Sequence, residues 1–214
     1  LHGVLNLEST HAGFFTAPVR EMFDAVAPQV AGAIHLARTA RALESANRKL
    51  EQLSMSDGLT GIANRRCFDQ RLALLWERGA RERTTLALLF VDADAFKPLN
   101  DACGHLHGDE CLRELARLCS AHAGEDDLAA RYGGEELALL LPGSDRAAAR
   151  TRAGSLLRAV RARRLPHPAS PVAAHLTVSI GVAALVPRAT QAPQALIALA
   201  DRALYLAKTR GRDR

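Results

Sequence analysis

The chain of 214 residues is long enough for one domain with a buried core and an attached element, and too short for two full domains. Its 48% hydrophobic and 24% charged residues are ordinary for a folded protein in water, which excludes disordered and fibrous classes. The net charge of +5 comes from scattered arginines and only 4% of residues are aromatic, so we expect no nucleic-acid binding.

The apolar runs are far shorter than the roughly 18 residues that a membrane-spanning helix needs, so no span is expected. The chain begins at Leu1 without a secretory signal pattern, and we interpret it as a cytoplasmic fragment of a longer protein. The four cysteines form no C-x-x-C pair, which favours reduced thiols. Zinc binding by Cys103, His105, His107 and Cys111 is an alternative, but their spacing fits no usual zinc motif.

Residues 1–37 predict a short strand over 3–7 and a helix that begins near Ala17. This order resembles the last strand and last helix of a GAF sensory domain. We therefore interpret residues 1–37 as the C-terminal remnant of a GAF-like sensor.

The next segment has the alternating steps of three and four that are typical of a coiled coil, at Val26, Gln29, Ala33, Leu36, Ala40, Leu43, Asn47 and Leu50. The single Asn47 on this seam favours a two-stranded parallel pairing, so residues 38–54 are predicted to form a coiled-coil linker in a homodimer. The alternative is a lone amphipathic helix that folds back on its own domain. Pro28 should kink the helix or start it.

A turn-rich segment over 56–61 marks the start of a domain that we place at residues 55–214. Helices are predicted over 64–78, 97–121, 146–161 and 194–210, and strands over 86–91, 127–132, 135–141 and 175–185. This alternation, with a two-residue hairpin turn at Gly133-Gly134 in positive φ, predicts an α/β fold in which helices flank a mixed central sheet.

Acidic residues follow two of the strands. Asp92-Ala93-Asp94 comes directly after an apolar strand, and Glu135-Glu136 stands just past the hairpin tip. Carboxylates at strand ends coordinate hard cations such as magnesium, so a nucleotide site is predicted if the hairpin lies beside this strand. The alternatives are a solvated hairpin and, for Asp92 and Asp94, caps of the next helix.

Between these clusters, Asn100 and Asp109 are candidates for reading a purine base, because a carboxylate can accept from the ring N–H and amino group of guanine. The alternative is that both residues cap helices.

Six ordered motifs resemble the GGDEF-type diguanylate cyclases. They are Asp57-Gly58-Leu59-Thr60-Gly61 through Arg66, Asp92-Ala93-Asp94 with Phe96-Lys97, Asn100-Asp101 with Gly104-His105 and Gly108-Asp109, Gly133-Gly134-Glu135-Glu136, Ser179-Ile180-Gly181, and Ala203-Leu204-Tyr205 through Lys208 to Gly211-Arg212. The resemblance implies a nucleotidyl-cyclase, polymerase-palm-like fold with an N-terminal signalling helix. It also implies condensation of two GTP into cyclic di-GMP, with release of pyrophosphate, by a homodimer of facing half-sites.

The resemblance assigns roles to individual residues. Two magnesium ions per active site, or manganese in their place, would be held by Asp92, the Ala93 carbonyl, Glu135 and nearby Glu136, with Glu135 also the base for the 3′-hydroxyl. The substrate would be bound by Asn100, His105 and Asp109 at guanine and ribose, by Lys208 and Arg212 on the last helix at the phosphates, and by Phe96 and Lys97.

Two positions depart from the family pattern. Leu137 replaces the usual Phe, and we expect only a packing adjustment. Gly124 stands at the Arg of the inhibitory Arg-x-x-Asp motif while Asp127 keeps the Asp, so product inhibition should be weak and Gly124→Arg should partly restore it. The alternative is an inhibitory site formed by other arginines, of which Arg113, Arg117 and Arg131 are the first candidates. The alternatives to an active enzyme are a catalytically silent module that binds GTP or cyclic di-GMP, and a plain coiled-coil interaction protein.

Overall fold

The computed structural model describes the backbone of residues 8–53 and 55–214, and the side chains of residues 8–45 and 55–214. The chain divides into two compact units, Leu1–Ser54 and Met55–Arg214. The strand predicted at residues 3–7 lies outside the described residues.

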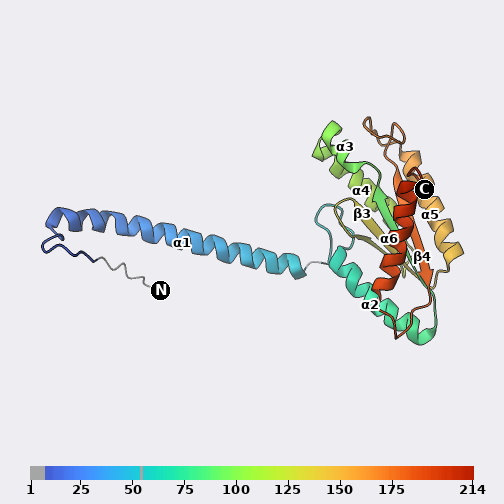
Figure 1. Ribbon diagram of the computed structural model, residues 1–214, viewed down its shortest axis with the longest axis horizontal. Helices are drawn as coiled ribbons and strands as arrows, with labels where there is room; N and C mark the ends of the chain where they lie inside the picture. Colours follow the sequence, from blue (N-terminus) through green and yellow to red (C-terminus); the bar gives the residue numbers. More distant parts are fainter. Residues whose placement is uncertain (1–7, 54) are drawn as a thin grey trace. The chain divides into compact units, whose positions relative to one another are not determined.

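The described residues of the first unit form one helix, α1 (Ala17–Leu53), which begins where the sequence predicts. It continues through Pro28, which therefore does not start it (Figure 1). The boundary predicted between residues 37 and 38 falls inside this helix, and the GAF-like remnant and the coiled-coil linker stay predictions. Val26, Leu36 and Leu43 on the predicted seam are 43%, 71% and 70% exposed. No helix in the described part of the chain is long and apolar enough to cross a membrane.

The second unit is built on a four-stranded sheet with the order β2-β3-β1-β4. Its strands are β1 (Leu86–Ala93), β2 (Leu128–Arg131), β3 (Glu136–Pro142) and β4 (Val178–Leu185). The predicted α/β fold with flanking helices is confirmed, but neighbouring strands all pair antiparallel, and the expectation of a mixed sheet was wrong in this respect. β1 and β2 do run in the same direction, but they are not neighbours, because β3 lies between them and pairs antiparallel with both.

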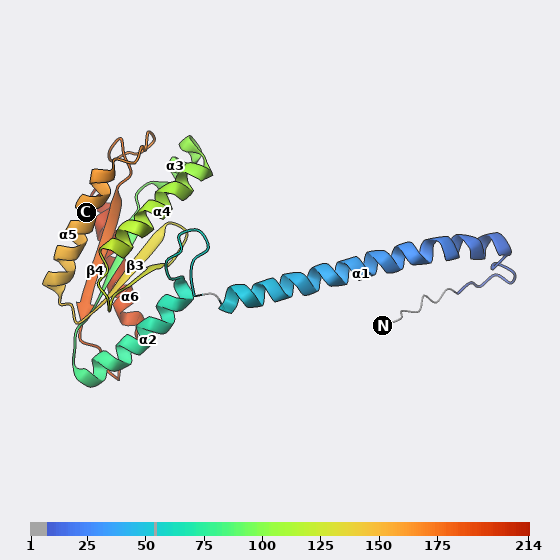
Figure 2. The same ribbon diagram turned by 180° about the vertical axis from the view of Figure 1, so that it is seen from behind.

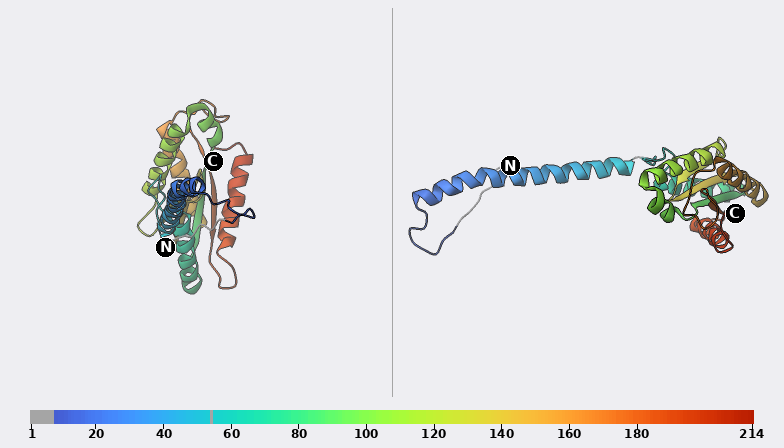
Figure 3. Two further views of the ribbon diagram at one scale, coloured as in Figure 1. Left: turned by 90° about the vertical axis from the view of Figure 1, so that its left-hand side faces the viewer. Right: turned by 90° about the horizontal axis from the view of Figure 1, so that it is seen from above.

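Helices cover both faces of the sheet (Figures 2 and 3). On one face lie α2 (Arg65–Glu82) and α6 (Gln194–Thr209), and on the other α4 (His105–Ala121) and α5 (Arg146–Arg163). The side chains of β1 are buried on both faces, alternating between the two core clusters. This double burial explains why β1 is an uninterrupted apolar run in the sequence.

The helical segment predicted over 97–121 is divided in two. A short helix, α3 (Phe96–Cys103), ends at Gly104, and α4 begins at the next residue. Gly104 has φ 83°, a left-handed conformation that glycine adopts without steric cost. The break changes the chain direction in the segment that carries the predicted base-reading residues.

The hairpin between β2 and β3 is longer than the two-residue turn predicted at Gly133-Gly134. The Tyr132 amide donates to the Glu136 carbonyl over 2.8 Å, and neither glycine has a positive φ. Gly133 serves a different purpose, because a Cβ there would overlap the Glu136 carboxylate. The absent Cβ leaves room for the end of the flexible Glu136 side chain.

A second close approach brings α6 onto β4. A Cβ on Gly181 would overlap the Ala200 carbonyl oxygen and the Leu204 amide of α6. The absent side chain therefore lets the helix pack directly on the strand, and this carries the end of α6 toward the end of β1.

Candidate active site at the end of the central strand

Asp92, near the end of β1, is the centre of the candidate site. Its side chain is buried, and its backbone is paired with Glu136 of β3 on one side and Ser179 of β4 on the other. The next amide, that of Ala93, donates to the Glu135 carbonyl over 3.3 Å. The structure thus brings the two acidic clusters of the sequence together.

Lys208 supplies the positive charge at this site. Its Nζ lies 2.8 Å from Asp92 Oδ2. Burial nevertheless raises the pKa of Asp92 above its usual value, against the opposing effect of Lys208. Burial, followed by the charge of Asp92, also raises the pKa of Glu135 and of Glu136. At all three carboxylates, the positive charge of Lys208 is outweighed by burial and by the neighbouring negative charges.

The chemistry of these groups suits a hard divalent cation. Within the described residues, no three His, Cys, Asp or Glu side chains are arranged as a ready metal site. Magnesium, however, is usually held by one or two carboxylates, with water and substrate phosphates completing its shell. The carboxylates of Asp92 and Glu135, with the Ala93 carbonyl, are oxygen ligands of the kind that this requirement names.

The predicted base-reading residues lie on either side of the break at Gly104. Asn100 is on α3, and its Oδ1 is buried without a hydrogen-bond partner among the described residues. A Cβ on Gly108 would overlap this oxygen and stand 3.2 Å from the Phe96 ring, so Gly108 makes room for both. Asp109 follows on α4 and is half-buried.

The other predicted substrate residues differ in exposure. Phe96 is buried and belongs to the core beneath the sheet, whereas Lys97 and His105 are exposed. A cavity of about 340 Å³ is lined by Glu136 of β3 and by five residues of α6: Asp201, Arg202, Leu204, Tyr205 and Lys208.

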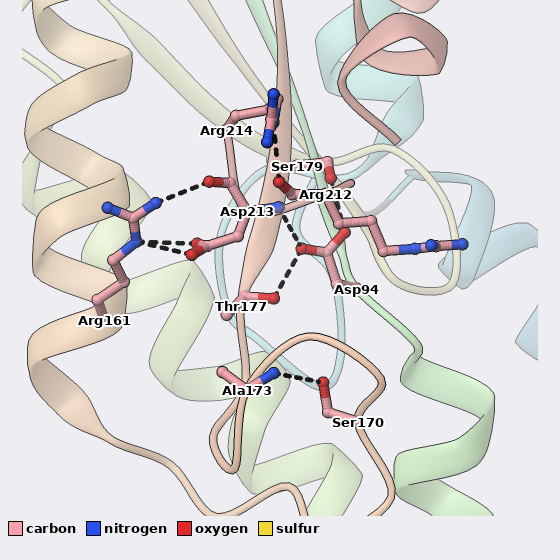
Figure 4. Close-up of polar contacts among 9 residues, drawn as sticks. All are labelled: Asp94, Arg161, Ser170, Ala173, Thr177, Ser179, Arg212, Asp213 and Arg214. Atoms are coloured by element: carbon pink, nitrogen blue, oxygen red, sulfur yellow. Dashed lines mark hydrogen bonds and ion pairs between the residues drawn. The ribbon is translucent and has the colours of Figure 1, made fainter. Parts of the chain in front are cut away.

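Arg212 lies beyond α6, which ends at Thr209, so the prediction that Arg212 is on the last helix was wrong. Asp94 does not cap α3 either, since the residue at that cap is Ala95. Its carboxylate instead accepts hydrogen bonds from the Thr177 and Ser179 hydroxyls and from the Asp213 amide (Figure 4).

Arg131 is a residue whose structural role the sequence did not reveal. Its guanidinium donates twice to the Gly134 carbonyl, over 3.1 and 2.7 Å, and also to both oxygens of Asp57. Burial raises the pKa of Asp57, but hydrogen bonds from Thr60 and Arg131 outweigh this and hold it below its usual value. Arg131 thus joins the turn after α1 to the loop before Glu135.

Asp127, the predicted inhibitory-site residue, already has partners. Its Oδ2 accepts from the Arg152 guanidinium over 2.9 Å and from the Gly124 amide over 2.7 Å. Arg152 lies on α5, far along the chain from Asp127, so the sequence motif around Gly124 could not predict this ion pair.

Comparisons with known proteins identify related sequences. The family model described as "Diguanylate cyclase, GGDEF domain" matches residues 54–214. The chain is 38% identical over 174 residues to the bifunctional diguanylate cyclase/cyclic di-GMP phosphodiesterase MucR of Pseudomonas aeruginosa, covering 81% of this chain and 25% of MucR. It is 36% identical over 171 residues to the diguanylate cyclase TpbB of the same species, covering 79% of this chain and 39% of TpbB. The chain therefore spans well under half of either relative.

A solved structure is similar as well. The coiled coil and GGDEF domain of DgcB from Caulobacter crescentus, in complex with c-di-GMP, matches with a TM-score of 0.69 and 31% identity. The match covers 85% of this chain and 96% of that one.

Proposed function

This chain belongs to the GGDEF family of diguanylate cyclases, and from that membership we propose that residues 55–214 join two GTP molecules into cyclic di-GMP and release two pyrophosphates. The observation that carries the proposal is the meeting of acidic and basic groups at the end of β1. There Asp92 is paired with Glu136 across the sheet and with Lys208 through its side chain.

Each bond-forming step is an in-line substitution at phosphorus. The 3′-oxygen of one GTP forms a bond to the α-phosphorus of the other, and the bond from that phosphorus to the pyrophosphate oxygen breaks. We assign the proton of the 3′-hydroxyl to the carboxylate of Glu135. The raised pKa of Glu135 supports this role, because a base is more effective when its pKa lies closer to neutrality.

Charge neutralisation is the second requirement of the reaction. Magnesium, when bound, supplies positive charge beside the phosphates, and Asp92, the Ala93 carbonyl and Glu135, with Glu136 nearby, would hold two such ions. Lys208 would leave Asp92 for the terminal phosphates when substrate binds. This exchange suits both partners, since it frees a carboxylate for the metal and gives the lysine a more highly charged anion.

Selection of guanine is proposed for Asn100, His105 and Asp109, with Phe96 and Lys97 beside them. The buried Oδ1 of Asn100 supports this, because an acceptor without a donor costs roughly 1–3 kcal/mol and a donor group of the base would offset that cost.

We further propose that the active form is a homodimer, because each site binds one GTP and the two substrates must face each other. The exposed side chains of Val26, Leu36 and Leu43 on the predicted seam support pairing through α1, which would raise the local concentration of the second half-site.

The experiment is incubation of the purified chain with GTP and magnesium, followed by chromatography and mass spectrometry of the product. Cyclic di-GMP is expected from the unmodified chain, and none from Glu135→Gln, whose circular dichroism should be unchanged. Glu125→Gln, an exposed glutamate in the turn before β2, is the matched control and should keep full activity. GTP binding without any product would favour the silent regulatory module, and full turnover by Glu135→Gln would remove Glu135 from the mechanism.

A further inference from the structure

The chain after α6 has an unusual backbone. Arg212 and Asp213 are consecutive residues with φ 63° and 52°, in the left-handed region. This conformation is unfavourable for residues that carry a Cβ, and it persists only where surrounding contacts enforce it. The contacts that do so here come from α5, from Asp94 just after β1, from β4 and from α6.

Asp213 is held from the α5 side by Arg161. The Arg161 Nε lies 2.9 Å from both carboxylate oxygens of Asp213, and a terminal nitrogen donates to the Asp213 carbonyl over 2.7 Å (Figure 4). Arg161 therefore contacts both the side chain and the backbone of Asp213. Such a planar, charge-assisted arrangement is one that arginine makes and lysine cannot reproduce.

From the sheet side, the same residue is anchored on Asp94. The Asp213 amide donates to Asp94 Oδ2 over 3.1 Å, and Asp94 is itself fixed by hydroxyl donors from Thr177 and Ser179 at 2.8 and 2.6 Å. Asp94 is only 1% exposed, so this anchor is a rigid part of the core. The Arg214 carbonyl then accepts from the Ile180 amide over 2.8 Å, which attaches the segment to the start of β4.

Arg212 stands between these anchors and α6. Its amide donates to the Ala207 carbonyl over 3.0 Å, and its side chain extends away from Arg161 (Figure 4). Its positive charge lowers the pKa of Asp92, a smaller effect than the burial that raises it.

We propose that Arg161 and Asp213 are positioning residues: their ion pair, anchored on Asp94, locks the C-terminal segment in the conformation that aims Arg212 at the GTP phosphates. This inference rests on the proposed function, which supplies the role of Arg212. Arg161 itself lies on α5 and is 46% exposed at its side chain.

The test compares Asp213→Ala, Arg161→Ala and Arg161→Lys by steady-state kinetics. Because the lock acts on phosphate binding, KM for GTP should rise on the order of tenfold in both alanine variants, with kcat within about twofold. Arg161→Lys should recover only part of the loss. The matched control is Arg158→Ala, one turn earlier on the exposed face of α5, which should leave KM unchanged.

A double-mutant cycle separates positioning from a general structural effect. In an Arg212→Ala background, Asp213→Ala should raise KM no further, since the group being aimed is already absent. An equal further rise would overturn the inference, as would an unchanged KM in Asp213→Ala.

Hydrogen exchange gives a readout that does not depend on turnover. The Ile180 amide should exchange faster in Arg161→Ala than in the Arg158→Ala control, and equal rates would contradict the lock. Absence of GTP binding and of product in the unmodified chain would instead contradict the proposed function. The two failures are therefore distinguishable.

Discussion

Asn100 and Asp109 provide the narrowest test of the proposed base pocket. Asn100→Ala and Asp109→Ala should each lower the preference for GTP over ATP by about tenfold or more, because a site that reads polar groups loses discrimination when its partners are removed. The measurement is the ratio of kcat/KM for the two nucleotides. Glu110→Ala, at an exposed neighbouring position of α4, is the control. A preference that stays the same in both variants would place guanine recognition elsewhere.

The structure changes the expectation for product inhibition. Progress curves should still be nearly linear as cyclic di-GMP accumulates, because Gly124 offers no guanidinium. Gly124→Arg alone should restore little curvature, however, since Asp127 is already paired with Arg152. Adding Arg152→Ala should free Asp127 and increase the curvature. Strong inhibition of the unmodified chain by micromolar product would contradict this account.

At the residue scale, the sequence predicts pairs that lie next to strand ends and misses pairs that depend on packing. The meeting of Asp92 with Glu135 and Glu136 followed from a strand end and a hairpin. The pairs Asp57–Arg131, Asp127–Arg152 and Arg161–Asp213 are 74, 25 and 52 residues apart, and no local pattern joins their partners. Only the folded sheet and its helices bring them within hydrogen-bond distance.

At the element scale, the ion pair between Asp57 and Arg131 predicts a pH dependence of stability. The pKa of Asp57 is lowered in the folded protein, so its contribution is present above the unfolded value of 3.8 and is lost as the pH falls through the folded value. Asp57→Asn should reduce the free energy of unfolding by roughly 1–3 kcal/mol at pH 7, and the difference should shrink below about pH 4.

Urea unfolding from pH 7 to pH 3 measures this difference. Asp69→Asn, at an exposed position of α2, is the matched control and should show no such trend. A destabilisation by Asp57→Asn that is the same at every pH would mean that the charge of Asp57 plays no part.

Most elements of the second unit begin and end within a few residues of their predicted bounds, because their apolar periodicity is strong. The errors come from glycine and from long connections. Gly133 and Gly134 indicated a two-residue turn in positive φ, but neither glycine has a positive φ and the hairpin closes from the Tyr132 amide to the Glu136 carbonyl. Whether neighbouring strands are parallel or antiparallel depends on the order of the strands in the sheet. The order of the elements along the chain does not determine that β3 lies between β1 and β2.

At the scale of the whole molecule, the account requires two copies. Specific activity should rise with protein concentration as dimers form. Leu36→Asp combined with Leu43→Asp should shift that rise to concentrations more than about tenfold higher, because burying each leucine is worth roughly 1.5–3 kcal/mol. Ser45→Asp, off the predicted seam of α1, is the control. Activity that is independent of concentration in all variants would contradict pairing through α1.

The central claim, cyclisation of two GTP molecules through their 3′-oxygens, is tested most directly by product stoichiometry. With GTP and magnesium, the account predicts two pyrophosphates released for each cyclic di-GMP formed. With 3′-deoxy-GTP, which keeps the base and triphosphate but lacks the attacking oxygen, it predicts neither product. Pyrophosphate release from 3′-deoxy-GTP at the rate seen with GTP, or release from GTP without any cyclic dinucleotide, would contradict the claim.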